Sequence, residues 1–493
     1  MTLNDVPAIA TRGIAIVAVG IIGALVIGWD IAQGNLTLPT VVAIPLVLGL
    51  FARWAGVAAD PFLGGILLVG YLVGNRGFAQ LNVPGIPLLP GEAVLGLALA
   101  LTLWRAARTQ TLPLRRDALN ALVLLWIAVG ATRLPFDFRQ YHISALRDFA
   151  MIYYALFFFL AQAWAEQPAA RRWLVGALTV GLALCGPIFY LFDLQQEWVT
   201  SNLTLGNVPL IFVKSDVAGG FMAAAVLWFA QLYSRLRHLG WLLLTSSALF
   251  GTVICNSRAA VIALGVGLLW LLILRQWRVL RPIALLVTIG LLALLIQAVT
   301  EPRPLTTLPL YRLYESATSI VDLDGTRVYQ VADLSDKPDN NQFRLVWWSS
   351  LISETWHDGP WLGLGFGRDL AAEFLRTYYA DNNNDFTARS PHNFLLTVFG
   401  RMGLLGEALI LAIIAIFAVK TWRAGRTPPS AITPSAHLPL WLTGWTVLTS
   451  ACFGVVLEGP MGATLFWTVL GLANASPMGA PPPSAPAPLD PKL

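Results

Sequence analysis

Apolar runs long enough to cross a lipid bilayer recur along almost the whole chain, from Arg12 nearly to the C-terminus. A hydrocarbon layer of about 30 Å takes about 20 apolar residues in an α-helix. A soluble core would need far more charge, since 56% of the residues are hydrophobic and only 12% are charged. Lipid must therefore surround most of the chain, which predicts an all-α, polytopic integral membrane protein.

We expect about 14 transmembrane helices, with boundaries that carry an error of several residues. The first run lacks a small-residue cleavage site and another span follows at once, so we expect it to stay as an anchor. The predicted spans are 13–29, 38–52, 61–74, 91–104, 118–133, 143–163, 172–192, 217–233, 239–255, 259–274, 282–299, 393–419, 438–457 and 460–474.

Basic residues mark every second connection between these spans. Short loops that carry Arg or Lys stay in the cytoplasm because their translocation is disfavoured. The alternation predicts that the N-terminus and the C-terminus are both cytoplasmic, in a bacterial cytoplasmic (inner) membrane. The cytoplasmic set is Arg53, Arg105, Arg108, Arg115, Arg116, Arg171, Arg172, Arg235, Arg237, Arg275, Arg278, Arg281, Lys420, Arg423 and Arg426.

The same alternation divides the chain into four regions. Residues 1–299 are expected to form an N-terminal transmembrane bundle of about eleven spans, and residues 393–475 about three C-terminal spans. Residues 300–392 form one large extracytoplasmic (periplasmic) loop with amphipathic helices, and a loop of that length is usually functional. Residues 476–493 are a Pro- and Ala-rich cytoplasmic tail with too little apolar surface to fold.

Composition argues against several function classes. The three cysteines, Cys185, Cys255 and Cys452, lie in or beside apolar runs and show no disulfide or metal spacing. The net charge of +5 is distributed by membrane side, so we expect no nucleic acid partner. Asp322 and Asp324 imitate the Asp-x-Asp of metal-dependent glycosyltransferases, but their segment is typical of a turn. We therefore expect neither a metal nor another cofactor.

Several arginines break the charge rule, because the topology places them on the outer side. An ionised residue at membrane depth is costly unless it pairs or faces a hydrated cavity. Arg258, in Asn256-Ser257-Arg258, has no acidic neighbour, which favours a functional role. For Arg147, which precedes Asp148, a structural ion pair is an equal alternative. The other outer arginines include Arg133, Arg139, Arg344, Arg368, Arg389 and Arg401.

Ser390-Pro391-His392-Asn393 directly precedes a long apolar run. Ser-Pro before such a run is a helix-start signature, so His392 is expected on the first turn of a helix at the outer interface. There an imidazole can accept a proton from a substrate hydroxyl. The alternative is that His392 is only a polar cap of the helix.

The large loop contains a second distinctive stretch. Residues 344–356 are predicted to form an amphipathic helix on the membrane surface, with Phe343, Trp347 and Leu351 on one face. The segment that follows, 357–367, ends in three alternating glycines that permit tight turns or a close approach of the backbone to a ligand. It lacks the strand–turn–helix context and the P-loop lysine of nucleotide sites. These glycines are Gly363, Gly365 and Gly367.

Three pieces in this order resemble the O-antigen ligase and O-antigen polymerase superfamily, and the resemblance covers roughly residues 200–470. Family members carry a helix ending in Ser-Arg, then a long periplasmic loop with Arg, Trp and a glycine-rich stretch, then His-Asn opening a helix with Gly-x-x-Gly. Two positions depart from the pattern: Lys214-Ser215-Asp216 stands where many members have Pro-Asn, and Arg401 where many have glutamate. The matching pieces are Asn256-Ser257-Arg258; Arg344 and Trp347-Trp348 leading to Pro360-Trp361-Leu362-Gly363-Leu364-Gly365-Phe366-Gly367; and His392-Asn393 with Gly403 and Gly406.

The resemblance implies a metal-independent glycosyltransferase of cell-surface polysaccharide biosynthesis. Such an enzyme moves a glycan from undecaprenyl pyrophosphate to an acceptor hydroxyl at the outer membrane face. The acceptor is a growing glycan for a polymerase, and a lipid A–core sugar or a protein for a ligase; the sequence leaves both open. A transporter or flippase that moves the lipid-linked glycan without forming a bond is the alternative from another class.

The resemblance also implies roles for particular residues. His392 would be the catalytic general base. The departing pyrophosphate would be stabilised by fixed cations, and the supporting residues would shape their surroundings. The expected pyrophosphate ligands are Arg258, Arg344, Lys214 and Arg147, and the expected supporting residues are Asn393, Ser257, Gly363, Gly365 and Gly367.

Overall fold

The computed structural model describes residues 49–82, 89–111, 114–205, 207–255, 257–300, single positions between 311 and 330, 337–378, 389–426 and 437–475. The predicted span 13–29, most of span 38–52 and the tail 476–493 lie outside the described residues. The contacts divide the chain into two compact units, Met1–Leu63 and Gly64–Leu493. The packing described below lies within the second unit.

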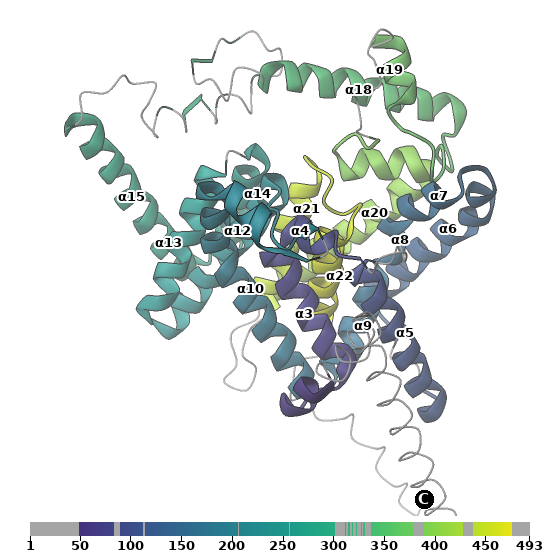
Figure 1. Ribbon diagram of the computed structural model, residues 1–493, viewed down its shortest axis with the longest axis horizontal. Helices are drawn as coiled ribbons and strands as arrows, with labels where there is room; N and C mark the ends of the chain where they lie inside the picture. Colours follow the sequence, from purple (N-terminus) through teal and green to yellow (C-terminus); the bar gives the residue numbers. More distant parts are fainter. Residues whose placement is uncertain are drawn as a thin grey trace, which may run out of the picture. The chain divides into compact units, whose positions relative to one another are not determined.

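Helices make up nearly all of the regular structure among the described residues (Figure 1). This confirms the predicted all-α class, with one small exception between α11 and α12, where β1 (Thr204–Leu205) pairs antiparallel with β2 (Val208–Pro209). The helices are α3 Ala59–Val73, α4 Asn75–Ala79, α5 Pro90–Thr109, α6 Ala118–Tyr141, α7 Ile143–Asp148, α8 Ala150–Tyr153, α9 Leu156–Ala165, α10 Pro168–Leu194, α11 Gln196–Asn202, α12 Ser215–Leu236, α13 Leu239–Ile254, α14 Arg258–Ile273, α15 Trp277–Thr300, α18 Lys337–Asp358, α19 Ala372–Tyr378, α20 Phe394–Arg426, α21 His437–Ala451 and α22 Pro460–Asn474.

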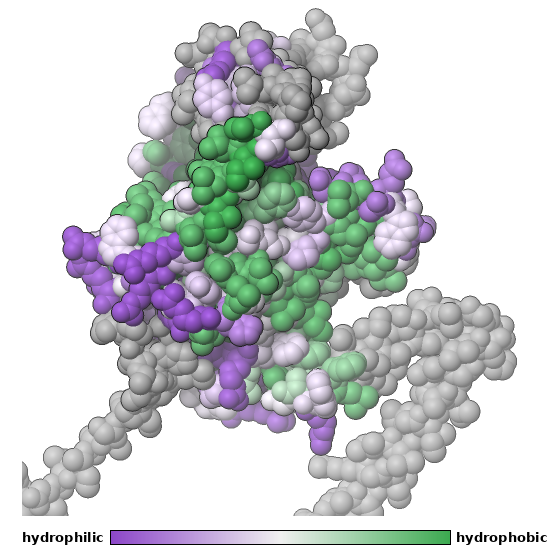
Figure 2. Space-filling model, turned by 90° about the vertical axis from the view of Figure 1, so that its left-hand side faces the viewer, coloured by the Kyte–Doolittle hydropathy of each residue, from purple (hydrophilic) through white to green (hydrophobic). Residues whose placement is uncertain are grey.

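Six segments of the described chain are long and apolar enough to cross a membrane. Their surfaces fit lipid better than water. On α15, for example, Leu285, Ile289, Leu292 and Ile296 follow a helical spacing and are each more than half exposed. Figure 2 shows broad hydrophobic areas on the face that it presents. The six are Ala118–Tyr141, Ile143–Ala165, Pro168–Leu194, Ser215–Leu236, Trp277–Gln297 and Phe394–Arg426.

Helix α12 is the most deeply buried of these segments, since every residue from Val217 to Gln231 is buried. It packs against α10, α13, α14, α15 and α21. Small residues permit this close packing: a Cβ built on Gly219 would lie 2.5 Å from the Cβ of Ala260 on α14. Elsewhere α22 packs against α9 and α21, and α20 packs against α6, α18 and α21.

Three predicted spans differ from the helices in the structure. The span 143–163 is divided into α7, α8 and α9, and the span 438–457 ends as a helix at Ala451. Helix α20 contains a break at Gly403, whose φ is +61°. A Cβ there would lie 2.5 Å from the carbonyl carbon of Trp361, so the break lets the glycine-rich segment approach α20.

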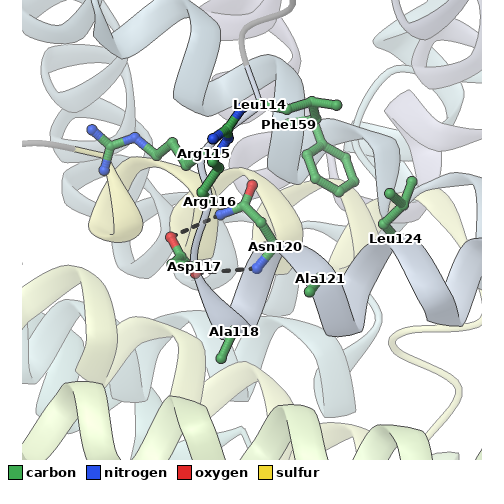
Figure 3. Close-up of a pocket in the computed structure, with 9 residues that line it drawn as sticks. All are labelled: Leu114, Arg115, Arg116, Asp117, Ala118, Asn120, Ala121, Leu124 and Phe159. Carbon is green, nitrogen blue, oxygen red and sulfur yellow. Dashed lines mark hydrogen bonds between the residues drawn. The ribbon is translucent and has the colours of Figure 1, made fainter.

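A buried amide network joins α6, α9 and α22 at the ends far from His392. Asp117 caps α6 by accepting hydrogen bonds from the backbone N–H of Leu119 at 2.9 Å and of Asn120 at 3.2 Å. It also accepts from the Asn120 side chain at 3.0 Å, and Figure 3 shows Asp117 bonded to Asn120. Asn474 donates to Asp117 and to Gln162, at 3.0 and 3.2 Å. Lys420, near the end of α20, pairs with Asp117 at 3.7 Å. Such satisfied polar networks fix the register of neighbouring helices.

Candidate active site

Four side chains predicted from the sequence come together from four different parts of the chain, and we call them the cationic cluster: Lys214, Arg258, Arg344 and His392. Lys214 precedes α12, Arg258 opens α14, Arg344 lies on α18 and His392 lies just before α20. The positive charges of Arg344 and Lys214 act on His392, and that of Arg258 acts on Arg344. Side chains that are up to 178 positions apart, as Lys214 and His392 are, thus share one site.

Burial and the neighbouring cations lower the pKa of His392 to about 4. Burial is the largest cause, Arg344 and Lys214 follow, and the carboxylate of Asp216 acts in the opposite direction. The imidazole is therefore neutral at neutral pH and can accept a proton. Burial and the charge of Arg258 also lower the pKa of Arg344, while Asp216 raises it. The Arg344 guanidinium remains protonated, as arginines in proteins do.

The segment after α21 holds two members of the cationic cluster in place. Arg344 donates to the carbonyl of Phe453 at 3.1 Å. Lys214 pairs with Asp216 at 3.0 Å. A Cβ built on Gly454 would lie 2.5 Å from the carboxylate of Asp216. Helix α21 ends at Ala451, and the turns that follow it bring Phe453 to Arg344 and Gly454 to Asp216.

His392 does not lie on the first turn of a helix, as predicted, but two residues before α20. Asn393 caps the helix instead: its side-chain oxygen accepts from the N–H of Leu395 at 3.1 Å and of Leu396 at 3.4 Å. This arrangement overturns the alternative in which His392 itself is the cap. His392 has a φ of +55°, a left-handed conformation that costs a non-glycine residue about 1 kcal/mol or more and is often found at functional sites.

Helix α18 supports His392 from one side. The ring of Trp347 lies 6.3 Å from the imidazole, and Trp348 donates to the carbonyl of Pro391 at 2.8 Å. Phe343, Trp347 and Leu351 were predicted to share an apolar face on the membrane surface, but this face packs within the protein: Trp347 and Leu351 are 2% and 1% exposed, and Phe343 packs against the same cluster as Trp347. The amphipathic face of α18 thus anchors the segment that carries the histidine.

The three alternating glycines make close contacts within the protein. Gly363, Gly365 and Gly367 have φ values of +73°, +95° and +92°. A Cβ on Gly365 would lie 2.6 Å from the carboxylate of Asp137, and one on Gly363 would meet the backbone of Arg401. The predicted tight turns are confirmed, and the close approach of backbone is to α6 and α20.

Carboxylates of α6 and α7 bind the backbone of this glycine segment. Asp137 accepts from the N–H of Phe366 at 2.7 Å and pairs with Arg133 at 3.2 Å. Asp148 accepts from the N–H of Gly367 at 2.9 Å. Arg133 in turn donates to the carbonyl of Gly363 at 2.8 Å. The segment is therefore held as a rigid support between α18 and α20.

Arg401 is a structural residue. Only 2% of it is exposed, and it pairs with Asp148 at 2.8 Å. It also donates to the carbonyls of Gly365 at 3.0 Å and Arg368 at 2.6 Å. These bonds satisfy the buried guanidinium, which explains how an arginine is tolerated at this position of α20.

Arg147 lines a cavity of about 250 Å³ that reaches His392. Asp148 forms its ion pairs with Arg401 and, at 3.7 Å, with Arg389, and in the described part of the chain no ion pair joins it to Arg147. The alternative of a structural Arg147–Asp148 pair is therefore wrong here. Arg147 is exposed, whereas the other predicted cations lie in the cationic cluster. The cavity is lined by Arg147, Asp148, Met151, Arg389, Ser390, His392, Thr397, Arg401, Val455 and Glu458.

Glu458, on the wall of this cavity, is a site residue that the sequence did not point to. It accepts from the Thr397 hydroxyl at 2.9 Å, and Thr397 contacts the Ser390 hydroxyl at 3.2 Å. Burial raises the pKa of Glu458, while its hydroxyl partners and Arg401 act in the opposite direction. Asp216 could have been found from the sequence, because it is an acidic residue two positions after Lys214 and lies on the first turn of α12. The only signal at Asp148 was its neighbour Arg147, which is not its partner.

The remaining predicted residues have less distinct places. Ser257 occupies the N-cap position of α14 without a capping side-chain bond, and Asn256 lies outside the described residues. Asp322 accepts from the Tyr329 hydroxyl at 2.9 Å, and Asp324 also lies outside the described part. Among the residues that the structure describes, no three His, Cys, Asp or Glu side chains are grouped to hold a metal ion.

The fold and the site define a class: a helical membrane protein that holds a neutral histidine among fixed cations next to a polar cavity. Residues 241–411 match the model of the O-antigen ligase family. The match confirms the resemblance to the O-antigen ligase and polymerase superfamily, and it includes Arg258, Arg344, His392 and the glycine segment. Residues 1–240, with Lys214 and Arg147, lie outside it. No curated protein sequence matches the chain.

Proposed function

We propose that this protein transfers a glycan from undecaprenyl pyrophosphate to an acceptor hydroxyl at the outer face of the bacterial inner membrane. The observation that carries the proposal is the neutral His392 beside Arg344 and Lys214, with Arg258 next to Arg344. In this proposal residues 300–392 form the outer loop and both termini are cytoplasmic, as the alternation of basic loops indicates.

The cationic cluster fits the departing pyrophosphate. In the transfer, the bond between the anomeric carbon and the pyrophosphate oxygen breaks, and its electron pair leaves with the pyrophosphate. Negative charge therefore builds up on that oxygen. Guanidinium groups stabilise such charge by bidentate, charge-assisted hydrogen bonds, and here they are already fixed before the reaction. Arg258 and Arg344 supply these forks, and Lys214 supplies a point charge.

His392 takes the proton of the acceptor hydroxyl as its oxygen forms the new bond to the anomeric carbon. A pKa of about 4 makes a free imidazole a weak base, but the cations that lower it are the same ones that bind the pyrophosphate. Binding of the anionic donor offsets their charge and raises the pKa of His392 toward neutrality. The donor thus activates its own base, and the free enzyme keeps the imidazole neutral.

The cavity beside His392 gives the substrates a polar approach to the histidine. Arg147 is exposed at this cavity and is not a member of the cationic cluster, so we propose that it contacts the pyrophosphate of the incoming donor. Polar groups on the other walls, such as Glu458 and the partly exposed Arg389, suit hydroxyl-rich glycans because they offer both acceptors and donors.

The proposal is tested with purified protein in vesicles that contain the lipid-linked glycan and an acceptor. His392→Ala should reduce transfer by about 10²–10⁴-fold, the usual contribution of a general base. His357→Ala is the matched control, because this exposed histidine on α18 bonds only to the carbonyl of Ser353 among described groups. Full transfer by His392→Ala would disprove the mechanism. Transbilayer movement of the glycan lipid without a new glycosidic bond would instead support the transporter alternative.

A further inference from the structure

A second cavity, of about 790 Å³, lies at the opposite end of the helices that carry the cationic cluster. Helix α12 begins after Lys214 and ends at this cavity with Arg235, and α14 begins with Arg258 and ends near Arg275. At 1.5 Å per residue the two ends of α12 are roughly 30 Å apart, about the thickness of a hydrocarbon layer. The lining residues are Gln231, Ser234, Arg235, Arg275, Gln276, Trp277, Arg278, Val279, Arg281, Ala424, Gly425 and Leu438.

This basic cavity has four guanidinium groups and no acidic side chain among its lining residues. The sequence explains the imbalance, because no Asp or Glu occurs between Asp216 and Glu301 or between Glu407 and Glu458. All lining residues come from these two stretches. Within the described part of the chain, Arg275, Arg278 and Arg281 form no ion pair. Four like charges around one cavity repel each other, so an anion from outside the chain would stabilise them.

The walls of the basic cavity are fixed rather than formed by loose side chains alone. The α14–α15 turn is closed by a hydrogen bond from the N–H of Gln276 to the carbonyl of Leu271 at 2.8 Å. The Gln276 side chain donates to the carbonyl of Gly425 at 2.9 Å, which ties this turn to the end of α20. The arginines that follow on α15 are therefore presented from a defined backbone.

Two further lining residues indicate the kind of anion. Trp277 is 54% exposed at the start of the apolar helix α15, as expected for a tryptophan at the level of lipid headgroups. Gln231 is 3% exposed, and its side-chain oxygen has no hydrogen-bond partner in the described structure. A buried oxygen of this kind needs a donor such as a hydroxyl. The ligand should thus combine phosphate with a hydroxyl group at the membrane surface.

We propose that the basic cavity binds the phosphate of an anionic lipid headgroup that also carries a hydroxyl, such as a phosphoglycerol group. Arginine suits phosphate because its planar fork donates two parallel hydrogen bonds. Basic pockets between transmembrane helices on the cytoplasmic side are known to hold such headgroups. A soluble phosphate compound has the same chemistry, so the experiment separates the two sources.

The test is native mass spectrometry of the purified full chain in detergent, with phosphatidylglycerol or phosphatidylcholine added. The wild type should retain phosphatidylglycerol selectively. Arg278→Gln combined with Arg281→Gln should weaken this binding by about tenfold or more, because two of the four charges are removed. The matched control is Arg237→Gln, since Arg237 is a nearby exposed arginine outside the lining that lies over the Tyr233 ring. Equal binding by the double variant and the wild type would overturn the proposal.

Two additional experiments identify which groups of the ligand, the phosphate or the hydroxyl, the basic cavity binds. Inorganic pyrophosphate should displace phosphatidylglycerol if phosphate is recognised. If pyrophosphate binds while no lipid is retained, and Arg278→Gln combined with Arg281→Gln weakens that binding, a soluble anion is the ligand of the basic cavity and the lipid assignment is wrong. The double variant is needed here because the cationic cluster should bind pyrophosphate in both proteins. Gln231→Leu should weaken phosphatidylglycerol about threefold, the order expected for one hydrogen bond, and leave phosphatidylmethanol, which lacks the headgroup hydroxyl, unchanged. An equal loss of both lipids would contradict the role of Gln231.

Discussion

The arginines that the sequence predicts on the outer side include two groups, which the charge rule treats alike and the structure separates. Arg133 and Arg401 each face a carboxylate, at 3.2 and 2.8 Å, and bind backbone carbonyls of the glycine segment. Arg344 instead lies beside other cations, so that Arg258 lowers its pKa and it lowers the pKa of His392. An arginine that forms an ion pair with a carboxylate stabilises the fold. Cations that lie beside other cations are instead suited to bind an anionic substrate.

The largest expected effect comes from exchanging one member of each group for alanine. Arg401→Ala leaves Asp148 without its closest partner and should cost about 3–5 kcal/mol of stability, so the protein should fail to fold or unfold at a much lower temperature. Arg344→Ala should instead reduce glycan transfer by about 10²–10³-fold with little change in thermal stability. Thermal unfolding in detergent and the transfer assay together measure both effects.

The comparison fails if Arg344→Ala unfolds the protein as readily as Arg401→Ala does. Arg376→Ala is the control for both variants, because Arg376 is 77% exposed and pairs only with the neighbouring Glu373 among described carboxylates. It should alter neither the unfolding temperature nor the transfer rate.

A smaller loss of protein stability is expected from a substitution in the glycine segment, which Arg133 and Arg401 bind through its backbone carbonyls. Gly363→Ala combines a positive φ with a Cβ that meets the backbone of Arg401 and should cost about 1–3 kcal/mol or more. Gly290→Ala on α15 is the matched control, because nothing lies within 4 Å of its added Cβ. Thermal unfolding of the two variants should therefore differ. Equal stability would mean that the glycine segment does not depend on this close packing.

The smallest effect expected is on the pH dependence of transfer. The free enzyme needs neutral His392, so kcat/KM for the donor should fall only as the pH drops through about 4. The acid limb of kcat should lie at higher pH, because the bound pyrophosphate raises the histidine pKa. Asp216→Asn removes a charge that raises this pKa, so it should move the limb of kcat/KM to lower pH. Glu373→Gln, on α19, should leave both limbs in place, because Glu373 is not among the charges that act on His392.

A shift of the acid limb to higher pH in Asp216→Asn would contradict the electrostatic account of His392. Coincident limbs for kcat/KM and kcat would contradict the proposed activation of the base by the donor.

Much of the fold followed from local patterns. Apolar runs predicted helices such as α10 and α12, and the spacing of Phe343, Trp347 and Leu351 predicted that they share one face of α18, although not that this face packs within the protein. The breaks between α7, α8 and α9 and the early end of α21 were missed, because hydropathy measures preference for lipid and does not report where distant groups bind the backbone.

For the candidate site, too, the sequence predicted some of the residues and the tertiary structure decided their partners. Residue type and charge singled out Arg258 and His392, because a cation or an imidazole beside an apolar run needs a special reason wherever the chain folds. The resemblance to the O-antigen ligase and polymerase superfamily selected Arg344 among the other arginines predicted on the outer side. The partners were decided by tertiary structure: Arg401 meets Asp148 across 253 positions, and Asn393 rather than His392 caps α20. Hydrophobic patterning depends on neighbours in sequence, whereas charge pairing and the pKa of an imidazole depend on distances that exist only after the helices have packed.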